Sequence, residues 1–192
     1  MLYQFLKPIT IAILKIFFGF QVKGKEVFPL NKPFILASNH LSNLDPVVLG
    51  AACPYRLYFL AKEELFENPL FALLIKTLGA IPLKRGGSNL KVMRLALNIL
   101  KNKPLVIFPQ GTRKEELDTF KAGVGFLYKK SKAPIIVAKI FNTDKVLPKN
   151  AKFIKKREKI RVIFDRLEGA FESDSYDLIA LKVIDRIKKL NN

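Results

Sequence analysis

The only histidine of this 192-residue chain, His40, stands shortly before an aspartate, Asp45. An imidazole is a general base near neutral pH when a carboxylate holds its tautomer, so this pair has the residue types needed for proton transfer. A structural interpretation competes, because Asp45 precedes Pro46 and an aspartate followed by proline is a common helix start. A lone imidazole cannot build a histidine metal cluster. The chemistry expected here is therefore acid–base chemistry without a metal.

The residues on either side predict the turn that holds this pair. Residues 34–37 are an apolar run typical of a buried strand, and residues 46–52 continue as a helix. His40 therefore lies in a strand-to-helix turn, which is where α/β proteins place their sites. Ser42 lies in the same turn and is an alternative, covalent nucleophile.

The rest of the chain alternates between apolar runs and amphipathic stretches, separated by turn residues. Further strands are predicted at residues 56–61, 80–84, 104–108, 133–140 and 159–164, and further helices at 68–79, 89–102, 121–132 and 173–190. This alternation predicts a single α/β domain in which helices flank a mixed β-sheet. The helix at residues 68–79 is apolar nearly all round, so we expect it to be buried either in protein or in lipid.

Composition points to an anionic partner. The chain has 34 Lys and Arg against 16 Asp and Glu, a formal charge of +18, which suits nucleic acid, a membrane surface or an acidic protein. Residues 145–166 alone hold nine Lys or Arg against two carboxylates. The presence of 16 Phe, 5 Tyr and no Trp favours apolar contact over base stacking. A single cysteine, Cys53, excludes an internal disulfide and a zinc cluster.

Residues 1–20 are apolar except for Gln4, Lys7, Thr10 and Lys15. At 100° per residue, Gln4, Lys7 and Lys15 fall within about 80° of one another and leave a wide apolar face. This pattern predicts an amphipathic helix in a membrane interface, although a helix packed on the protein's own core would share it. The uncharged runs are too short to span a bilayer, so we expect neither a transmembrane helix nor a secretory signal.

Four blocks, in order between about residues 22 and 140, resemble the glycerolipid acyltransferases, in particular bacterial 1-acylglycerol-3-phosphate acyltransferases. The blocks are residues 39–45 (NHLSNLD), Lys62 with Leu65 and Pro69 followed by residues 79–85 (GAIPLKR), residues 108–113 (FPQGTR), and residues 133–136 (APII). The first carries the family's histidine and aspartate separated by four residues. Two departures stand out. Gln110 replaces the family's usual glutamate, and the fourth block lacks a second proline near Val137.

The resemblance implies a glycerol-3-phosphate acyltransferase-like fold and transfer of a fatty acyl group from a thioester. The donor is acyl-ACP or acyl-CoA, and the acceptor is the sn-2 hydroxyl of 1-acylglycerol 3-phosphate. His40 would be the general base and Asp45 its orienting carboxylate, with no cofactor and no metal. The implied substrate-binding residues are Lys62, Arg85, Gln110, Gly111, Thr112 and Arg113. The two arginines would bind the phosphate as forks, with Lys62 as a secondary charge.

The amphipathic pattern and the resemblance together predict a membrane-interface helix at residues 1–20 and an acyltransferase domain at residues 21–192. The expected location is the cytoplasmic face of the inner cell membrane, as a peripheral or monotopic protein on an anionic surface. Three alternatives remain. Gln110 suggests another lysolipid acceptor or a non-catalytic lipid-binding protein, and the charge alone would suit a nucleic-acid-binding domain. Because that last alternative leaves the ordered blocks unexplained, we expect no nucleic-acid partner.

Overall fold

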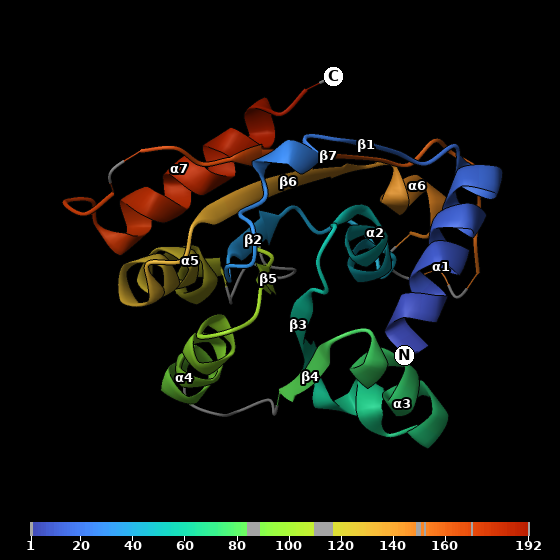
Figure 1. Cartoon of the computed structure of the whole chain (residues 1–192), viewed down its shortest axis with the longest axis horizontal. Helices are drawn as coiled ribbons and strands as arrows, with labels where there is room; N and C mark the ends of the chain where they lie inside the picture. The colour runs from blue at the N-terminus through green and yellow to red at the C-terminus, as the bar shows by residue number, and fades with distance from the viewer. Residues whose placement is uncertain are drawn as a thin grey trace.

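The computed structural model describes residues 2–83, 89–109, 117–148, 151, 153–169 and 171–191. Within these residues, seven strands form one sheet in the order β1-β7-β6-β2-β5-β3-β4 (Figure 1). The strands are β1 Gln21–Lys23, β2 Ile35–Ser38, β3 Tyr58–Lys62, β4 Ala80–Leu83, β5 Leu105–Ile107, β6 Ile135–Phe141 and β7 Arg161–Arg166. The α-helices are α1 Leu2–Phe18, α2 Asp45–Ala52, α3 Pro69–Thr77, α4 Asn89–Leu100, α5 Leu117–Ser131, α6 Thr143–Val146 and α7 Tyr176–Lys189. Two 3-10 helices, η1 Lys25–Val27 and η2 Glu63–Phe66, complete the elements.

The sheet is mixed, as the sequence predicted. β6, β2, β5, β3 and β4 run parallel to their neighbours, while β7 runs antiparallel to β6 and β1 pairs parallel with β7. Parallel neighbours need crossover connections, and helices provide them on the faces of the sheet. The carboxyl ends of β2, β5 and β6 therefore meet at one edge, the edge that His40 reaches directly after β2.

Two layers of helices cover the sheet (Figure 1). On one face, Leu36 of β2 packs in a core with side chains from α1 and α2. On the other face, Ile35 and Ala37 pack with side chains from α4, α5 and α7. Successive strand residues point to opposite faces. Burial of both faces explains why the strand at residues 34–37 is a continuous apolar run rather than an alternating one.

The N-terminal segment was expected either in a membrane interface or packed on the protein core, and each of these interpretations fits a different side of α1. Leu14 and Phe18 are buried in the core, while Phe5, Ile9 and Ile16 are exposed. The helix thus packs on the protein and still presents an apolar outer stripe. None of the helices in the described residues is long and apolar enough to cross a membrane.

Hydrogen bonds from Lys7 and Arg56 connect α1, the end of α2 and the end of α3. Lys7 Nζ donates to the carbonyl oxygens of Cys53 (2.5 Å) and Pro54 (3.3 Å), directly after α2. Arg56 donates to the carbonyl oxygen of Thr77 (2.8 Å) at the end of α3. Cations are favourable at helix C-termini, where carbonyl groups lack partners within the helix. Partial burial of the Lys7 ammonium group at this contact lowers its pKa.

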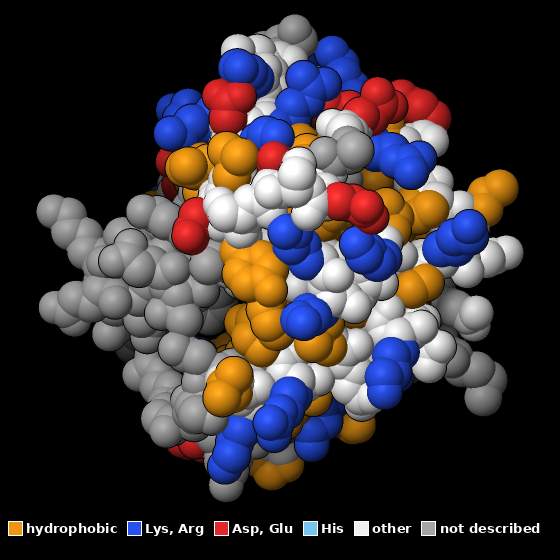
Figure 2. All heavy atoms as spheres, turned by 90° about the vertical axis from the view of Figure 1, so that its left-hand side faces the viewer, with side chains coloured by type: hydrophobic (Ala, Val, Ile, Leu, Met, Phe, Trp, Pro, Cys, Tyr) orange, Lys and Arg blue, Asp and Glu red, His pale blue; other side chains and the backbone are white. Residues whose placement is uncertain are grey.

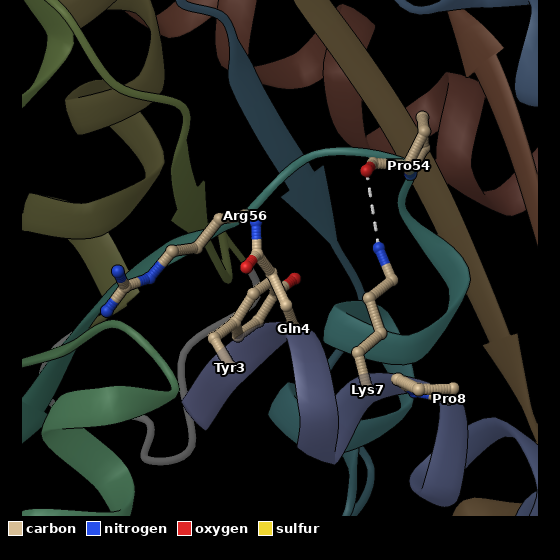
Figure 3. Close-up of a pocket in the computed structure, with 6 residues that line it drawn as sticks. All are labelled: Tyr3, Gln4, Lys7, Pro8, Pro54 and Arg56. Carbon is tan, nitrogen blue, oxygen red and sulfur yellow. Dashed lines mark hydrogen bonds between the residues drawn. The ribbon is translucent and has the colours of Figure 1, made fainter. Parts of the chain in front are cut away.

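Figure 3 shows the surface pocket of about 490 Å³ that these two cations line, with Tyr3, Gln4, Pro8 and Pro54. The pocket lies just before the first residue of β3. His40 lies beyond the last residue of β2, and both strands run parallel to β5. The pocket and His40 are therefore at opposite edges of the sheet. Because Lys7 and Arg56 donate hydrogen bonds to carbonyl groups at helix ends, we interpret the pocket as part of a structural contact between helices.

The helix predicted at residues 68–79 is α3, and it is not buried in the protein. Asn68 Oδ1 accepts the Phe71 backbone N–H (3.0 Å), an N-cap that fixes where the helix begins. Among its residues only Ala72 is buried, and Leu70 is 81% exposed. Of the two environments expected for this helix, burial within the protein is wrong.

Close packing of α5 against α7 gives a test of the fold. A Cβ on Gly125 would lie 2.2 Å from the backbone oxygen of Tyr176, whereas a Cβ on Gly123 would meet only the Met93 side chain at 3.5 Å. Gly125→Ala should therefore lower the free energy of unfolding by about 1–3 kcal/mol, because backbone must move. Gly123→Ala, the matched control, should be neutral or stabilising by up to about 1 kcal/mol through helix propensity. Urea denaturation followed by far-UV circular dichroism measures both, and equal stabilities would contradict this packing.

Candidate active site

His40 and Asp45 are in direct contact. Nδ1 of His40 lies 2.8 Å from Oδ2 of Asp45. The carboxyl group is fully buried, whereas the imidazole side chain is 23% exposed. This combination leaves one partner fixed in the protein interior and the other open to a substrate.

The Asp45 carboxyl accepts three further hydrogen bonds. Oδ2 accepts the backbone N–H groups of Leu41 (2.5 Å) and Ser42 (2.8 Å), and Oδ1 accepts the Thr143 hydroxyl (2.6 Å). Because all three partners are donors, we assign the shared proton to Nδ1 of His40. Nε2 then carries the lone pair that a general base needs.

The structural interpretation of Asp45 is only partly right. Asp45 does begin α2, with Pro46 in the first turn. Its side chain, however, turns back to Leu41 and Ser42 rather than capping the N–H groups ahead of it. The Asp-Pro sequence begins the helix through the backbone, which leaves the carboxyl free to bind the imidazole.

Two neighbours fix the turn and the ring. Asn39 is buried and pairs with the backbone of Ile140 in β6, donating to its oxygen (2.9 Å) and accepting from its nitrogen (2.8 Å). The Phe108 ring stacks on the His40 ring, with centroids 4.2 Å apart and planes inclined by 20°. Stacking and hydrogen bonding together restrict the imidazole to one orientation.

Neither Ser42, the alternative nucleophile, nor the single cysteine is placed for attack. Ser42 is buried, and its hydroxyl donates to the Leu147 carbonyl (2.6 Å) while accepting the Leu44 N–H (3.2 Å). Cys53 is also buried, and desolvation raises the pKa of its thiol to about 12. Ser42 and Cys53 are therefore both buried within the fold, and the accessible His40 is the better candidate for a reacting side chain.

The predicted substrate-binding residues are only partly within the described structure. Lys62 is the last residue of β3, is exposed, and lies at the same sheet edge as His40. Since β5 separates β2 from β3, the two strands are about 10 Å apart. Arg85, Gln110, Gly111, Thr112 and Arg113 lie outside the described residues.

Sequence reasoning missed Asn39 as an anchor and the contributions of Phe108 and Thr143. Thr143 is the hardest to find, because it stands 98 residues from Asp45 in a four-residue helix. The sequence feature that could have indicated Thr143 is its position shortly after the strand predicted at residues 133–140, which pairs with β2 in the structure. Polar residues that follow neighbouring parallel strands meet at one edge.

The fold and this site define an α/β protein in which a buried carboxyl group contacts an accessible histidine. A family model described as Acyltransferase matches residues 19–140, which is more than half of the chain. The chain belongs to the acyltransferase family.

Relatives and a solved structure agree with this assignment. The 1-acyl-sn-glycerol-3-phosphate acyltransferase of Bacillus subtilis is 31% identical over 139 residues, covering 71% of this chain and 70% of the relative. The protein of the same name from Saccharomyces cerevisiae is 30% identical over 186 residues, covering 91% of this chain and 61% of the relative. The chain spans about half the length of several other curated relatives that it matches.

The structural comparison extends over nearly the whole chain. The crystal structure of the 1-acyl-sn-glycerophosphate (LPA) acyltransferase PlsC from Thermotoga maritima matches with a TM-score of 0.75 at 22% identity. The match covers 97% of this chain and 78% of that one. At this identity the likeness shows the fold.

The Thr143 hydrogen bond gives the test of the site. Thr143→Val keeps the shape but removes the donor to Asp45 Oδ1, which leaves a buried charge short of one partner. We expect acyltransferase turnover to fall about tenfold with little change in KM, because the imidazole loses its firm support. Thr143→Ser retains the hydroxyl and should keep most of the turnover. Turnover is measured per folded molecule, and a valine variant as fast as wild type would remove Thr143 from the positioning network.

Proposed function

We propose that this chain transfers a fatty acyl group from a thioester donor to the sn-2 hydroxyl of 1-acylglycerol 3-phosphate, giving phosphatidic acid. The observation that carries the proposal is the hydrogen bond from His40 Nδ1 to the buried Asp45 carboxyl. Relatives at about 30% identity are 1-acyl-sn-glycerol-3-phosphate acyltransferases by name, which supports the choice of acceptor.

The pair can perform the transfer by direct attack. Nε2 of His40 takes the proton of the glycerol hydroxyl as its oxygen attacks the thioester carbonyl carbon. The Asp45 carboxylate stabilises the imidazolium that forms. As the tetrahedral intermediate collapses, the carbon–sulfur bond breaks and the imidazolium returns the proton to the leaving thiolate. No step needs a metal or a cofactor.

Binding of the acceptor phosphate is assigned to three cationic side chains. Lys62, the last residue of β3, lies at the same sheet edge as His40 and can supply a charge. The family resemblance adds Arg85 and Arg113 as bidentate partners, with Gln110, Gly111 and Thr112 as further substrate-binding residues. An alternative acceptor, another lysolipid, is favoured by one observation, Gln110 in place of the usual glutamate. The donor is acyl-ACP or acyl-CoA.

We also propose that α1 acts as a membrane-interface helix at residues 1–20, in front of an acyltransferase domain at residues 21–192. Its exposed stripe, with Phe5 and Ile9, supports apolar insertion, and the charge of +18 supports attraction to anionic lipids. Stable surface attachment usually needs two such signals. The proposed location is the cytoplasmic face of the cell membrane.

The proposed function is tested by identifying the products of the reaction. The purified protein is incubated with a panel of lysolipids and with both donor types, and the products are identified by mass spectrometry. Phosphatidic acid should form from 1-acylglycerol 3-phosphate, and His40→Ala should lower its rate by about 10²–10⁴-fold with KM little changed. Asp144→Asn, which alters an exposed carboxylate beside Thr143, is the matched control and should leave the rate unchanged.

Three outcomes would contradict the proposal in different ways. A preferred lysolipid without the phosphate monoester would assign another acceptor. Lipid binding without any product would favour the non-catalytic alternative. Near-normal turnover in His40→Ala would remove His40 as the base.

A further inference from the structure

The basic stretch predicted from residues 145–166 contains an exposed segment that the reaction does not use. We call residues 153–159 the rim segment. Its side chains Phe153 and Ile154 are 79% and 55% exposed. Four cations follow within five residues, against one carboxylate, for a net charge of +3: Lys155, Lys156, Arg157, Lys159 and Glu158. Large apolar side chains protruding beside a cluster of cations are unusual for a surface that meets only water.

The rim segment lies beside the C-terminal end of α1. The Ile160 N–H donates to the Phe18 carbonyl (3.0 Å), and the Arg157 guanidinium lies 5.3 Å from the centroid of the Phe17 ring. Ile16 and Phe17 are themselves exposed. Figure 1 shows the coil after α6, in orange, running next to α1. The exposed apolar residues at the end of α1 therefore lie next to the cationic part of the rim segment.

The rim segment is also anchored to the element that supports the candidate site. The Lys155 N–H donates to the Val146 carbonyl of α6 (2.9 Å), and Asn142 donates to the Lys159 carbonyl (2.8 Å). Thr143, the first residue of α6, donates to Asp45. The exposed apolar residues are thus joined through α6 to the side of the sheet where His40 lies.

We propose that the rim segment and the C-terminal end of α1 form one docking surface for an anionic lipid bilayer. Phe153 and Ile154 insert among the acyl chains, and the neighbouring cations lie at the level of the lipid phosphates. This inference rests on the proposed function and deepens it, because it places the active-site edge against the membrane that holds the acceptor. The lipid then reaches His40 without crossing open water.

A bilayer fits this surface better than an acidic carrier protein does. Cations alone are enough to attract an acidic protein, whereas protruding Phe and Ile side chains in a segment that also contacts an apolar helix suit insertion into a bilayer. The face with α4, α5 and α7 is different (Figure 2), since carboxylates lie among its cations. Its ion pairs include Lys132 with Glu172 and Lys182 with Asp174. In the rim segment Glu158 pairs with Lys156, and this hydrogen bond lowers the pKa of Glu158. Glu158 is therefore ionised at neutral pH, and the net charge of +3 already includes its negative charge.

Vesicle binding tests the proposal with a matched control. The full chain is mixed with phosphatidylcholine vesicles, with or without phosphatidylglycerol, and the bound fraction is measured by flotation. Wild type should bind the anionic vesicles more tightly. Phe153→Glu with Ile154→Glu should lower the partition coefficient at least tenfold. Leu178→Glu with Leu181→Glu adds the same charge to exposed leucines of α7 and should change binding less than twofold.

Charge and apolar contributions are separated by a second variant. Lys155→Gln with Arg157→Gln should lower binding to anionic vesicles about tenfold and leave binding to neutral vesicles nearly unchanged. Circular dichroism confirms that each variant is folded. Equal binding by wild type and the Phe153 and Ile154 double variant would overturn the proposal.

Two further outcomes are distinguishable. If vesicle binding is unchanged, and the double variant loses turnover only with an acyl carrier protein donor, the surface binds the acidic carrier and the bilayer proposal is wrong. Absence of acyl transfer to every lysolipid would instead overturn the proposed function. The vesicle measurement does not depend on that result.

Discussion

The buried carboxyl group of Asp45 is the constraint on which the site depends. A carboxylate without exposure to water must be compensated by hydrogen bonds and an opposite partial charge, or its burial is costly. Two backbone N–H groups, the Thr143 hydroxyl and the His40 imidazole provide this compensation. These four contacts also determine which tautomer of His40 is expected. Because the other three partners donate to Asp45, we assign Nδ1–H of the imidazole to this contact, which leaves the second nitrogen with the lone pair that the proposed general base requires.

The sheet topology brings these partners together from distant parts of the chain. β2 and β6 are parallel neighbours, so the residues that follow each strand meet at one edge. Asn39 fixes the turn after β2 to the backbone of Ile140, and Thr143 reaches Asp45 from just beyond β6. The network is embedded in the core rather than mounted on a mobile loop. Such rigidity suits general base catalysis, since small displacements of a positioned group reduce the rate strongly. It also means that stability and activity share residues.

The sequence predicts the parts of this structure that have strong local signals. Apolar runs located five strands, β2 to β6, and alternation at residues 159–164 located β7. Burial on both faces of the sheet explains the unbroken apolar runs of β2 and β6. Pro and Asn at helix starts located α2 and α3. Residues 21–23 and the four-residue α6 were missed, since elements this short have no measurable period. The contact of His40 with Asp45 was expected from spacing, but Thr143 depends on strand order, which local patterns do not encode. The environment of α3 was ambiguous for a related reason. An apolar helix has the same pattern whether it packs against protein or faces outward.

The most direct test of this account is the tautomer of His40. Because it is the only histidine, ¹⁵N labelling of histidine gives a spectrum that belongs to this side chain alone. At a pH where the imidazole is neutral, the account predicts a protonated Nδ1 and an unprotonated Nε2, held so by the Asp45 carboxyl. A protonated Nε2, or an averaged spectrum in which both tautomers are populated, would contradict it, because His40 would then lack the fixed lone pair assigned to the general base.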